Sequence, residues 1–224
     1  MDILTGKVNP SGKLNETYPL KYEYTPAFRY FPSTERNTEY RESLFTGYRY
    51  YDTNKVPVLY PFGYGLSYTV FSYSDLQVDE TGVTFTVANT GNRDGAEVAQ
   101  LYVGLPGANV FRPEKELKGF QKIFLKAGEQ KEVRIPFDDK TFRYWNVKTG
   151  KWEVEKGEYQ IMVGACVSDI RLAAGYRAEG TTTEYPWRDH CPVSVFYIYA
   201  GDSGRRTGRH RVYVAAGTHE DFRC

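Results

Sequence analysis

Carboxyl groups in the first quarter of the chain are the first candidates for chemistry, because paired carboxyl groups can act as nucleophile and general acid–base. The candidates in this region are Glu35, Glu39, Glu42 and Asp52. Glu39 and Glu42 are three residues apart and would share one face of a helix. The acids flank Arg36 and Arg41, however, which is typical of acids on a solvated surface. The sequence therefore assigns no catalytic residue.

Histidine and cysteine, which are common metal ligands, gather near the C-terminus. They are His190, Cys191, His210, His219 and Cys224. No pair of them has the spacing of a zinc site, so we predict no metal. The basic run at 205–211 could contact nucleic acid, but a solvated tail is the favoured interpretation, and we expect no nucleic-acid partner. Lys is absent after Lys156, whereas six Arg lie beyond residue 187. We interpret 187–224 as an anomalous tail, either out of frame or disordered.

Two glycine-containing segments superficially resemble nucleotide-binding loops. Five residues separate Gly6 from Gly12, where a phosphate loop has four, and Leu14 stands where Ser or Thr would bind magnesium. Gly63 and Gly65 lack the third glycine and the strand-to-helix setting of a dinucleotide site. We therefore predict no cofactor and interpret residues 63–65 as a tight structural turn.

Tyrosine is concentrated in the first third of the chain, where 12 of the 20 tyrosines lie between Tyr18 and Tyr73. One interpretation is that they stack on sugar rings, whose C–H faces suit an aromatic face. The other is that they pack one domain against another, with each hydroxyl reaching a polar partner. Packing is favoured for the five considered, which are Tyr48, Tyr50, Tyr51, Tyr64 and Tyr68.

Alternating apolar residues and regular turns predict an antiparallel β-sandwich in the middle of the chain. The predicted strands are 71–78, 83–88, 97–105, 117–125, 132–137, 158–166 and 170–178. Seven short strands of this kind favour an immunoglobulin-like sandwich. Tyr159 stands where a tyrosine corner would place a hydroxyl on an upstream carbonyl, or it is an ordinary buried tyrosine.

The region before the sandwich has Pro19, Pro26 and Pro32 and no helical period. Such a long irregular stretch is unusual inside a complete domain and suggests a segment that lies across a larger body. We expect a helical turn at about 39–44. Strand-like pieces are expected at 47–51 and 56–60, with a hairpin-like turn between them.

Composition limits the class of protein. With 224 residues, 41% hydrophobic and 25% charged, the chain is globular, yet too short for a (β/α)₈ barrel enzyme with an accessory domain. Its net charge of +1 favours no anionic partner. We predict no membrane span and no signal peptide. The three Cys do not form a disulfide scaffold. The compartment is not fixed, although free cysteines favour a reducing cytosol.

Several motifs in fixed order carry a family resemblance. They are Asn-Pro-Ser-Gly-Lys-Leu at 9–14, the run at 40–52, Leu-Tyr-Pro-Phe-Gly-Tyr-Gly-Leu-Ser-Tyr-Thr at 59–69, and pieces at 87–91, 95–103, 115–120 and 157–159. The first three resemble the last part of the second domain of glycoside hydrolase family 3, with Tyr60 in place of the usual Phe. The remainder resembles that family's C-terminal fibronectin type III-like domain.

This resemblance implies a β-glucosidase- or β-xylosidase-like enzyme that retains configuration and needs no cofactor. It also implies that the nucleophilic Asp lies on a barrel domain and the acid–base Glu on the second domain, ahead of the Asn-Pro-Ser-Gly motif. Neither position is present here, which suggests a truncated reading frame or gene fragment that is inactive alone. The implied partners are a carbohydrate substrate of the intact enzyme and the missing barrel and second domain of the same polypeptide.

The expected fold class is mostly β. We expect the tail of the second, α/β domain at 1–24, a Tyr/Pro-rich linker at 25–70 and a fibronectin type III-like sandwich at 71–180. The alternative function is a stand-alone β-sandwich module that binds carbohydrate or protein.

Overall fold

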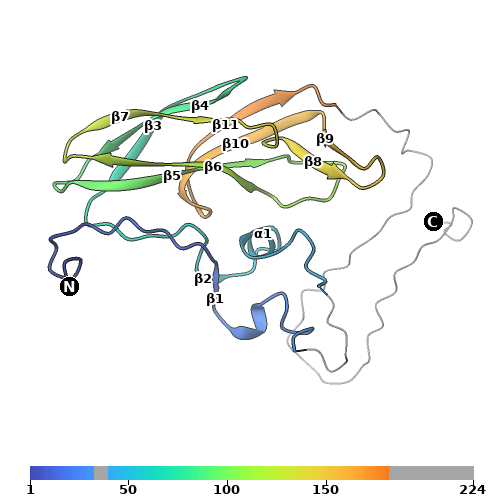
Figure 1. The fold of residues 1–224 in the computed structure, drawn as a ribbon, viewed down its shortest axis with the longest axis horizontal. Coiled ribbons are helices and arrows are strands. Elements are labelled where there is room, and N and C mark those ends of the chain that lie inside the picture. Colours follow the sequence, from blue (N-terminus) through green and yellow to red (C-terminus); the bar gives the residue numbers. More distant parts are fainter. Residues whose placement is uncertain (33–39, 182–224) are drawn as a thin grey trace, which may run out of the picture. The chain divides into compact units, whose positions relative to one another are not determined.

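The computed structural model describes residues 1–32 and 40–181, and its central feature is two facing antiparallel sheets (Figure 1). One sheet has the order β11-β10-β5-β6 and the other β3-β4-β7. The strands are β3 Phe71–Asp79, β4 Gly82–Asn89, β5 Gly95–Gly104, β6 Glu116–Leu125, β7 Gln130–Pro136, β10 Gly157–Cys166 and β11 Asp169–Ala178. The predicted mostly-β sandwich is thus confirmed.

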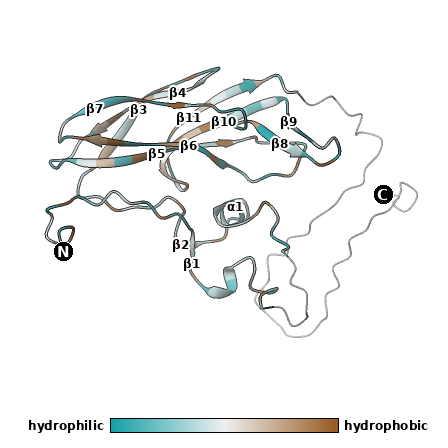
Figure 2. Ribbon diagram, viewed as in Figure 1, coloured by the Kyte–Doolittle hydropathy of each residue, from teal (hydrophilic) through white to brown (hydrophobic). Residues whose placement is uncertain are grey.

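The core lies between these sheets because alternate residues of each strand point inward. Phe85 and Val87 of β4 face Leu101 of β5 and Ile161 of β10, and all four side chains are buried. Figure 2 shows the hydrophobic stretches on the strands of the sandwich. Apolar burial of this kind is the main driving force that holds the two sheets together.

The seven predicted strands all form, with ends shifted by at most a few residues. A further hairpin, β8 Arg143–Asn146 with β9 Lys151–Val154, was not predicted. Each of its strands has only four residues, too few to show a clear alternation. Trp145 and Trp152 pair across this hairpin with their rings 5.5 Å apart.

The segment at 1–32 and 40–70, here called the N-terminal segment, contains little regular structure. Its elements are β1 Tyr18–Pro19, the 3₁₀ turn η1 Tyr22–Tyr24, the helix α1 Tyr48–Thr53 and β2 Val58–Tyr60. Of the strand expected at 56–60, only Val58–Tyr60 forms. This strand, β2, pairs with β1 and not with residues 47–51. Figure 1 shows α1, β1 and β2 along one side of the sandwich. Among the described residues no helix is long and apolar enough to cross a membrane.

The strand expected at 47–51 is wrong, because Tyr48–Thr53 is the helix α1. Tyr48, Tyr51 and Asp52 share one helical face at i, i+3 and i+4. Tyr51 is buried, and Asp52 pairs with Lys115 in the loop before β6. These contacts override the strand preference of a Tyr-rich sequence. Residues 41–44 form a turn in which the N–H of Phe45 donates to the Glu42 carbonyl at 2.8 Å.

Candidate functional site

The contact surface between the N-terminal segment and the four-stranded sheet contains several buried or partly buried polar contacts between residues distant in sequence. It is called the internal interface here, and its central residues are Tyr48, Gly63, Gln100 and Tyr102. Gln100 and Tyr102 are two residues apart on β5 and therefore point to the same side of the sheet. Both side chains are buried, so the segment shields this part of the sheet from water.

Gln100 holds the segment to the sheet through its amide group. Its Nε2 donates to the Gly63 carbonyl at 3.2 Å and to the Ala165 carbonyl at 2.7 Å. Its Oε1 accepts from the Tyr102 hydroxyl at 2.6 Å. A Cβ at Gly63 would lie 2.2 Å from Oε1, and Gly63 has φ +78°, so this close approach requires glycine. The tight turn expected at 63–65 forms slightly earlier, with the Tyr64 N–H donating to the Pro61 carbonyl at 3.2 Å, and it admits a side chain of the sandwich.

Tyr48 of α1 adds an aromatic contact beside this amide. Its ring stacks on Phe62 at 4.7 Å and meets the edge of Tyr102 at 6.2 Å. Its hydroxyl accepts a hydrogen bond from the Leu117 N–H of β6 at 2.8 Å. Desolvation by burial raises the pKa of the Tyr48 phenol, and the same cause raises that of Tyr102. Both phenols are therefore neutral, as hydrogen-bonded packing groups should be.

Ion pairs join the two regions at both ends of the interface. The Lys13 ammonium lies 2.8 Å from the buried Glu97 carboxylate, which also accepts from the Tyr73 hydroxyl at 3.2 Å. At the other end, Lys115 lies 3.1 Å from Asp52. Because these charges are largely removed from water, each depends on its partner.

Asn9 connects three stretches of chain with one amide. Its Nδ2 donates to the Asp94 carbonyl at 3.0 Å. Its Oδ1 accepts from the Tyr68 N–H at 2.8 Å and from the Ser67 hydroxyl at 3.1 Å. The Asn-Pro-Ser-Gly motif thus fastens the start of the segment to the turn before β5. No local pattern reveals this role, because its partners lie 58 to 85 residues away.

The candidate carboxylates do not converge on a site. Asp52 is paired with Lys115, and Glu42 is half-buried within the turn at 41–44. Glu35 and Glu39 lie outside the described residues. The histidines, the basic run at 205–211 and the remainder of the expected tail also lie outside them. Among residues 1–32 and 40–181, no cluster of His, Cys, Asp and Glu has the geometry of a metal site.

The five tyrosines considered for sugar stacking divide into two groups. Tyr51 is buried and Tyr48 is hydrogen-bonded within the interface, which supports packing for both. Tyr50 meets the ring of Tyr51 edge-on. The ring of Tyr64 lies 5.3 Å from that of Tyr60. Tyr68, whose hydroxyl donates to the Ile3 carbonyl, is the one exposed side chain of the five.

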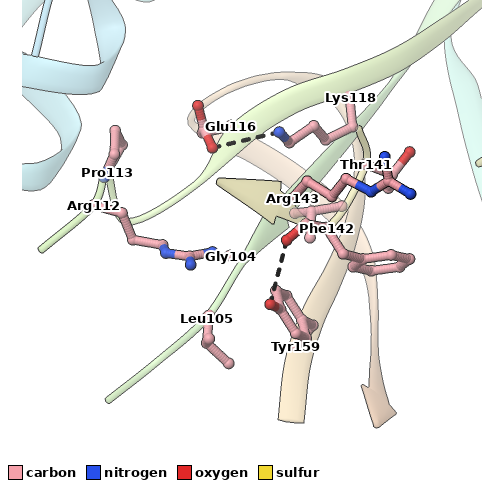
Figure 3. A pocket seen from close by; sticks show the side chains of 11 residues that line it. Gly104, Leu105, Arg112, Pro113, Glu116, Lys118, Thr141, Phe142, Arg143 and Tyr159 are labelled. Carbon is pink, nitrogen blue, oxygen red and sulfur yellow. Dashed lines mark hydrogen bonds and ion pairs between the residues drawn. The ribbon is translucent and has the colours of Figure 1, made fainter. Parts of the chain in front are cut away.

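A small cavity lies at the far end of the sandwich, next to Tyr159 (Figure 3). The Tyr159 hydroxyl lies 2.9 Å from the Glu155 carbonyl and 3.4 Å from that of Phe142, which confirms the tyrosine corner. Arg112, also in the lining, pairs with Glu155 at 3.2 Å. The cavity volume is about 10 Å³, which is space for no more than a single water. The contacts of Tyr159 and Arg112 therefore stabilise the fold at this end of the sandwich.

Comparison with known proteins shows what this architecture is similar to. Residues 97–166 match the family model of the fibronectin type III-like domain. The thermostable β-glucosidase B of Acetivibrio thermocellus is 46% identical over 188 residues, which are 80% of this chain and 25% of that enzyme. The exo-α-(1→6)-L-arabinopyranosidase of Bifidobacterium longum is 46% identical over 191 residues, 83% of this chain and 25% of that enzyme.

A solved structure agrees with these sequence matches. The GH3 β-glucosidase of Bifidobacterium adolescentis superimposes with a TM-score of 0.78 at 43% identity, covering 83% of this chain and 28% of that one. The chain thus spans about a quarter of the length of the curated relatives it matches. From these matches in sequence and fold, the chain belongs to glycoside hydrolase family 3, in which it corresponds to the C-terminal portion that carries the fibronectin type III-like domain.

Proposed function

We propose that this chain is the C-terminal part of a retaining glycoside hydrolase that acts on terminal β-linked glucosides or xylosides. Its role is to supply a rigid sandwich and, through the internal interface, a fixed conformation for the segment that leads into the catalytic body. The match to β-glucosidases over 80% of this chain but only 25% of their length carries the proposal.

The environment of the buried carboxylates supports a structural role. Retaining hydrolysis needs two carboxyl groups about 5–5.5 Å apart at the bound sugar. Glu97 is paired with Lys13, and Glu155 with Arg112. Glu153 accepts from Thr149 at 2.6 Å, and this bond, followed by that from Asn146, lowers the pKa of the Glu153 carboxyl. Carboxylates held in this way stabilise the fold, so we assign the nucleophile and the acid–base to parts of the enzyme outside this chain.

We also assign sugar specificity to parts of the enzyme outside this chain. A β-glucosidase and an exo-α-(1→6)-L-arabinopyranosidase match the chain at the same 46% identity and over nearly the same length. A region that selects the sugar should differ between enzymes that are named for different glycosides, and this region does not differ more from one of them than from the other.

The proposed partner of the N-terminal segment is the remainder of the same polypeptide. Large apolar side chains of this segment are exposed: Tyr18, Leu20, Tyr22, Phe28, Phe31, Tyr40, Leu44, Leu59 and Tyr60. A concentration of exposed aromatic and aliphatic side chains is typical of a contact surface. We propose that the catalytic body of the enzyme covers it.

A chimera tests the function. Residues 1–181 would replace the matching quarter of the Acetivibrio thermocellus β-glucosidase, and hydrolysis of a nitrophenyl β-glucoside would be measured. We expect the chimera to hydrolyse the substrate and the 224-residue chain alone to show no turnover.

Glu42→Gln is the control for the carboxylate weighed above. The variant chimera should keep its activity, because Glu42 has no assigned part in the chemistry. Turnover by the 224-residue chain alone that disappears in Glu42→Gln would contradict the proposal, as would a folded chimera without activity.

A further inference from the structure

A hollow of about 290 Å³ opens where the N-terminal segment meets the turn between β10 and β11. Lys13, Pro61, Tyr64 and Gly65 line it from the segment. Ala165, Cys166, Ser168 and Asp169 line it from the sandwich. At roughly 30 Å³ for each water of liquid volume, the hollow holds about ten waters, enough for one small organic ring.

Both walls of the hollow are fixed by hydrogen bonds, so the shape exists before any ligand arrives. Leu14 and the turn exchange two backbone bonds of 2.8 Å, from Gly63 N–H to the Leu14 carbonyl and from Leu14 N–H to that of Tyr64. The Val167 N–H donates to the Phe62 carbonyl at 3.1 Å, which joins the two walls directly. A pre-formed site loses little conformational entropy on binding.

The lining combines apolar surface with a few polar groups. Tyr64, Pro61 and Ala165 supply the apolar part, and Tyr64 supplies an aromatic ring. Ser168 contributes a hydroxyl that can donate and accept. Figure 1 shows the two contributing regions next to each other, at the turn that joins β10 to β11.

The charged groups of the lining are already neutralised. The Lys13 ammonium is paired with Glu97 at 2.8 Å and keeps two further N–H donors. Arg171 binds Asp169 with two nitrogens, at 2.6 and 2.7 Å, which leaves lone pairs on the carboxylate. The hollow therefore offers both donors and acceptors with no net charge, which suits a neutral, hydroxyl-rich molecule.

We propose that this hollow is a binding site for a single neutral monosaccharide, with one ring face against Tyr64 and hydroxyls on Asp169 and Ser168. A cyclic sugar matches the lining because it has an apolar C–H face and a polar rim. The inference goes beyond the proposed catalytic function, since it requires nothing outside this chain. Failure of the chimera would leave it standing, and failure of sugar binding would leave the proposed hydrolase standing.

Isothermal titration of the 224-residue chain with D-glucose and with D-xylose tests the site. We expect saturable binding of at least one of these sugars in the millimolar range, with a single site per chain. Sorbitol, which has the hydroxyls but no ring, should bind at least about tenfold more weakly, because it lacks a rigid apolar face.

Two substitutions with matched controls locate the sugar. Tyr64→Ala should weaken binding about tenfold, whereas Tyr22→Ala, at an exposed tyrosine outside the hollow, should not. Asp169→Asn should also weaken it, whereas Asp79→Asn, at another Arg-paired aspartate on β3, should leave it unchanged. Thermal unfolding of each variant checks that the fold is kept.

The proposal is overturned if neither sugar gives saturable binding, or if sorbitol binds as well as the sugars. The proposal is also overturned if folded Tyr64→Ala and folded Asp169→Asn both bind the sugar as tightly as the unsubstituted chain, because the ligand would then occupy another surface.

Discussion

The sandwich and the N-terminal segment are built on different principles. In the sandwich, interior apolar side chains and long antiparallel ladders hold the backbone, and most core residues are almost fully buried. The segment has one helix of six residues and two short strands, and it relies on single side chains such as Gln100 that belong to the sandwich. The sandwich therefore specifies its own conformation, whereas the segment takes its conformation from the sheet beneath it.

The largest expected effect removes the core on which both regions depend. Phe85 is 1% exposed and lies in the middle of β4. Phe85→Ala should lower the free energy of unfolding by about 3–5 kcal/mol, through lost apolar burial and the cavity left behind. Denaturant unfolding followed by circular dichroism measures this change. A loss below about 1 kcal/mol would show that the sandwich is not the dominant source of stability.

A substitution at the internal interface should separate the two regions. Gln100→Ala leaves the carbonyls of Gly63 and Ala165 and the Tyr102 hydroxyl without their partner, at a cost of about 1–3 kcal/mol. Hydrogen exchange should speed up at residues 61–65 and remain slow in β4 and β5. Equal acceleration in both regions would show that segment and sandwich open as one unit.

Tyr159→Phe should produce a smaller effect, confined to the sandwich. It removes the hydroxyl that lies 2.9 Å from the Glu155 carbonyl but keeps the buried ring. We expect a loss of about 1 kcal/mol in the free energy of unfolding. Exchange at residues 61–65 should not change, and a change there would reveal coupling between the ends of the molecule.

Strongly alkaline solution should act on the tyrosines at and beside the internal interface. Burial raises the pKa of Tyr73, with the Glu97 carboxylate as the next cause, and burial also raises the pKa of Tyr48 and Tyr102. The unfolded chain then loses these protons first, so their stabilisation is complete below pH 10.0 and is lost as the pH rises above it. Thermal melts from pH 7 to strongly alkaline solution, together with tyrosinate absorbance, measure this decline. Tyr73→Phe should make it shallower, and an unchanged slope would contradict the assignment.

Sequence reasoning succeeded where the signal is local. Alternation in Val83-Thr84-Phe85-Thr86-Val87 fixes which side chains face the core, and the position of Tyr159 indicates its corner. The helix α1 could not be predicted in this way, because the Tyr48 ring packs against Phe62 and Tyr102. Both partners are distant in sequence, so no local pattern indicates these contacts.

The internal interface lay further beyond reach. In the sequence, Gln100 looks like an ordinary strand residue. Its role depends on Gly63 and Ala165, which only the folded chain brings next to it. The hollow lined by Tyr64 and Asp169 is likewise formed by segments that are distant in sequence. Long-range contacts of this kind depend on the completed fold rather than on any local pattern.

The reach of Gln100 has a consequence for synthesis on the ribosome. Its amide joins Gly63 to Ala165, so the anchor of the segment is complete only after the penultimate strand of the sandwich has been translated. Because translation proceeds from the N-terminus, the Tyr-rich stretch leaves the ribosome about a hundred residues before this anchor is complete. During that interval its aromatic side chains are available to chaperones and to neighbouring nascent chains. The N-terminal segment thus reaches its final conformation only after most of the sandwich has been made.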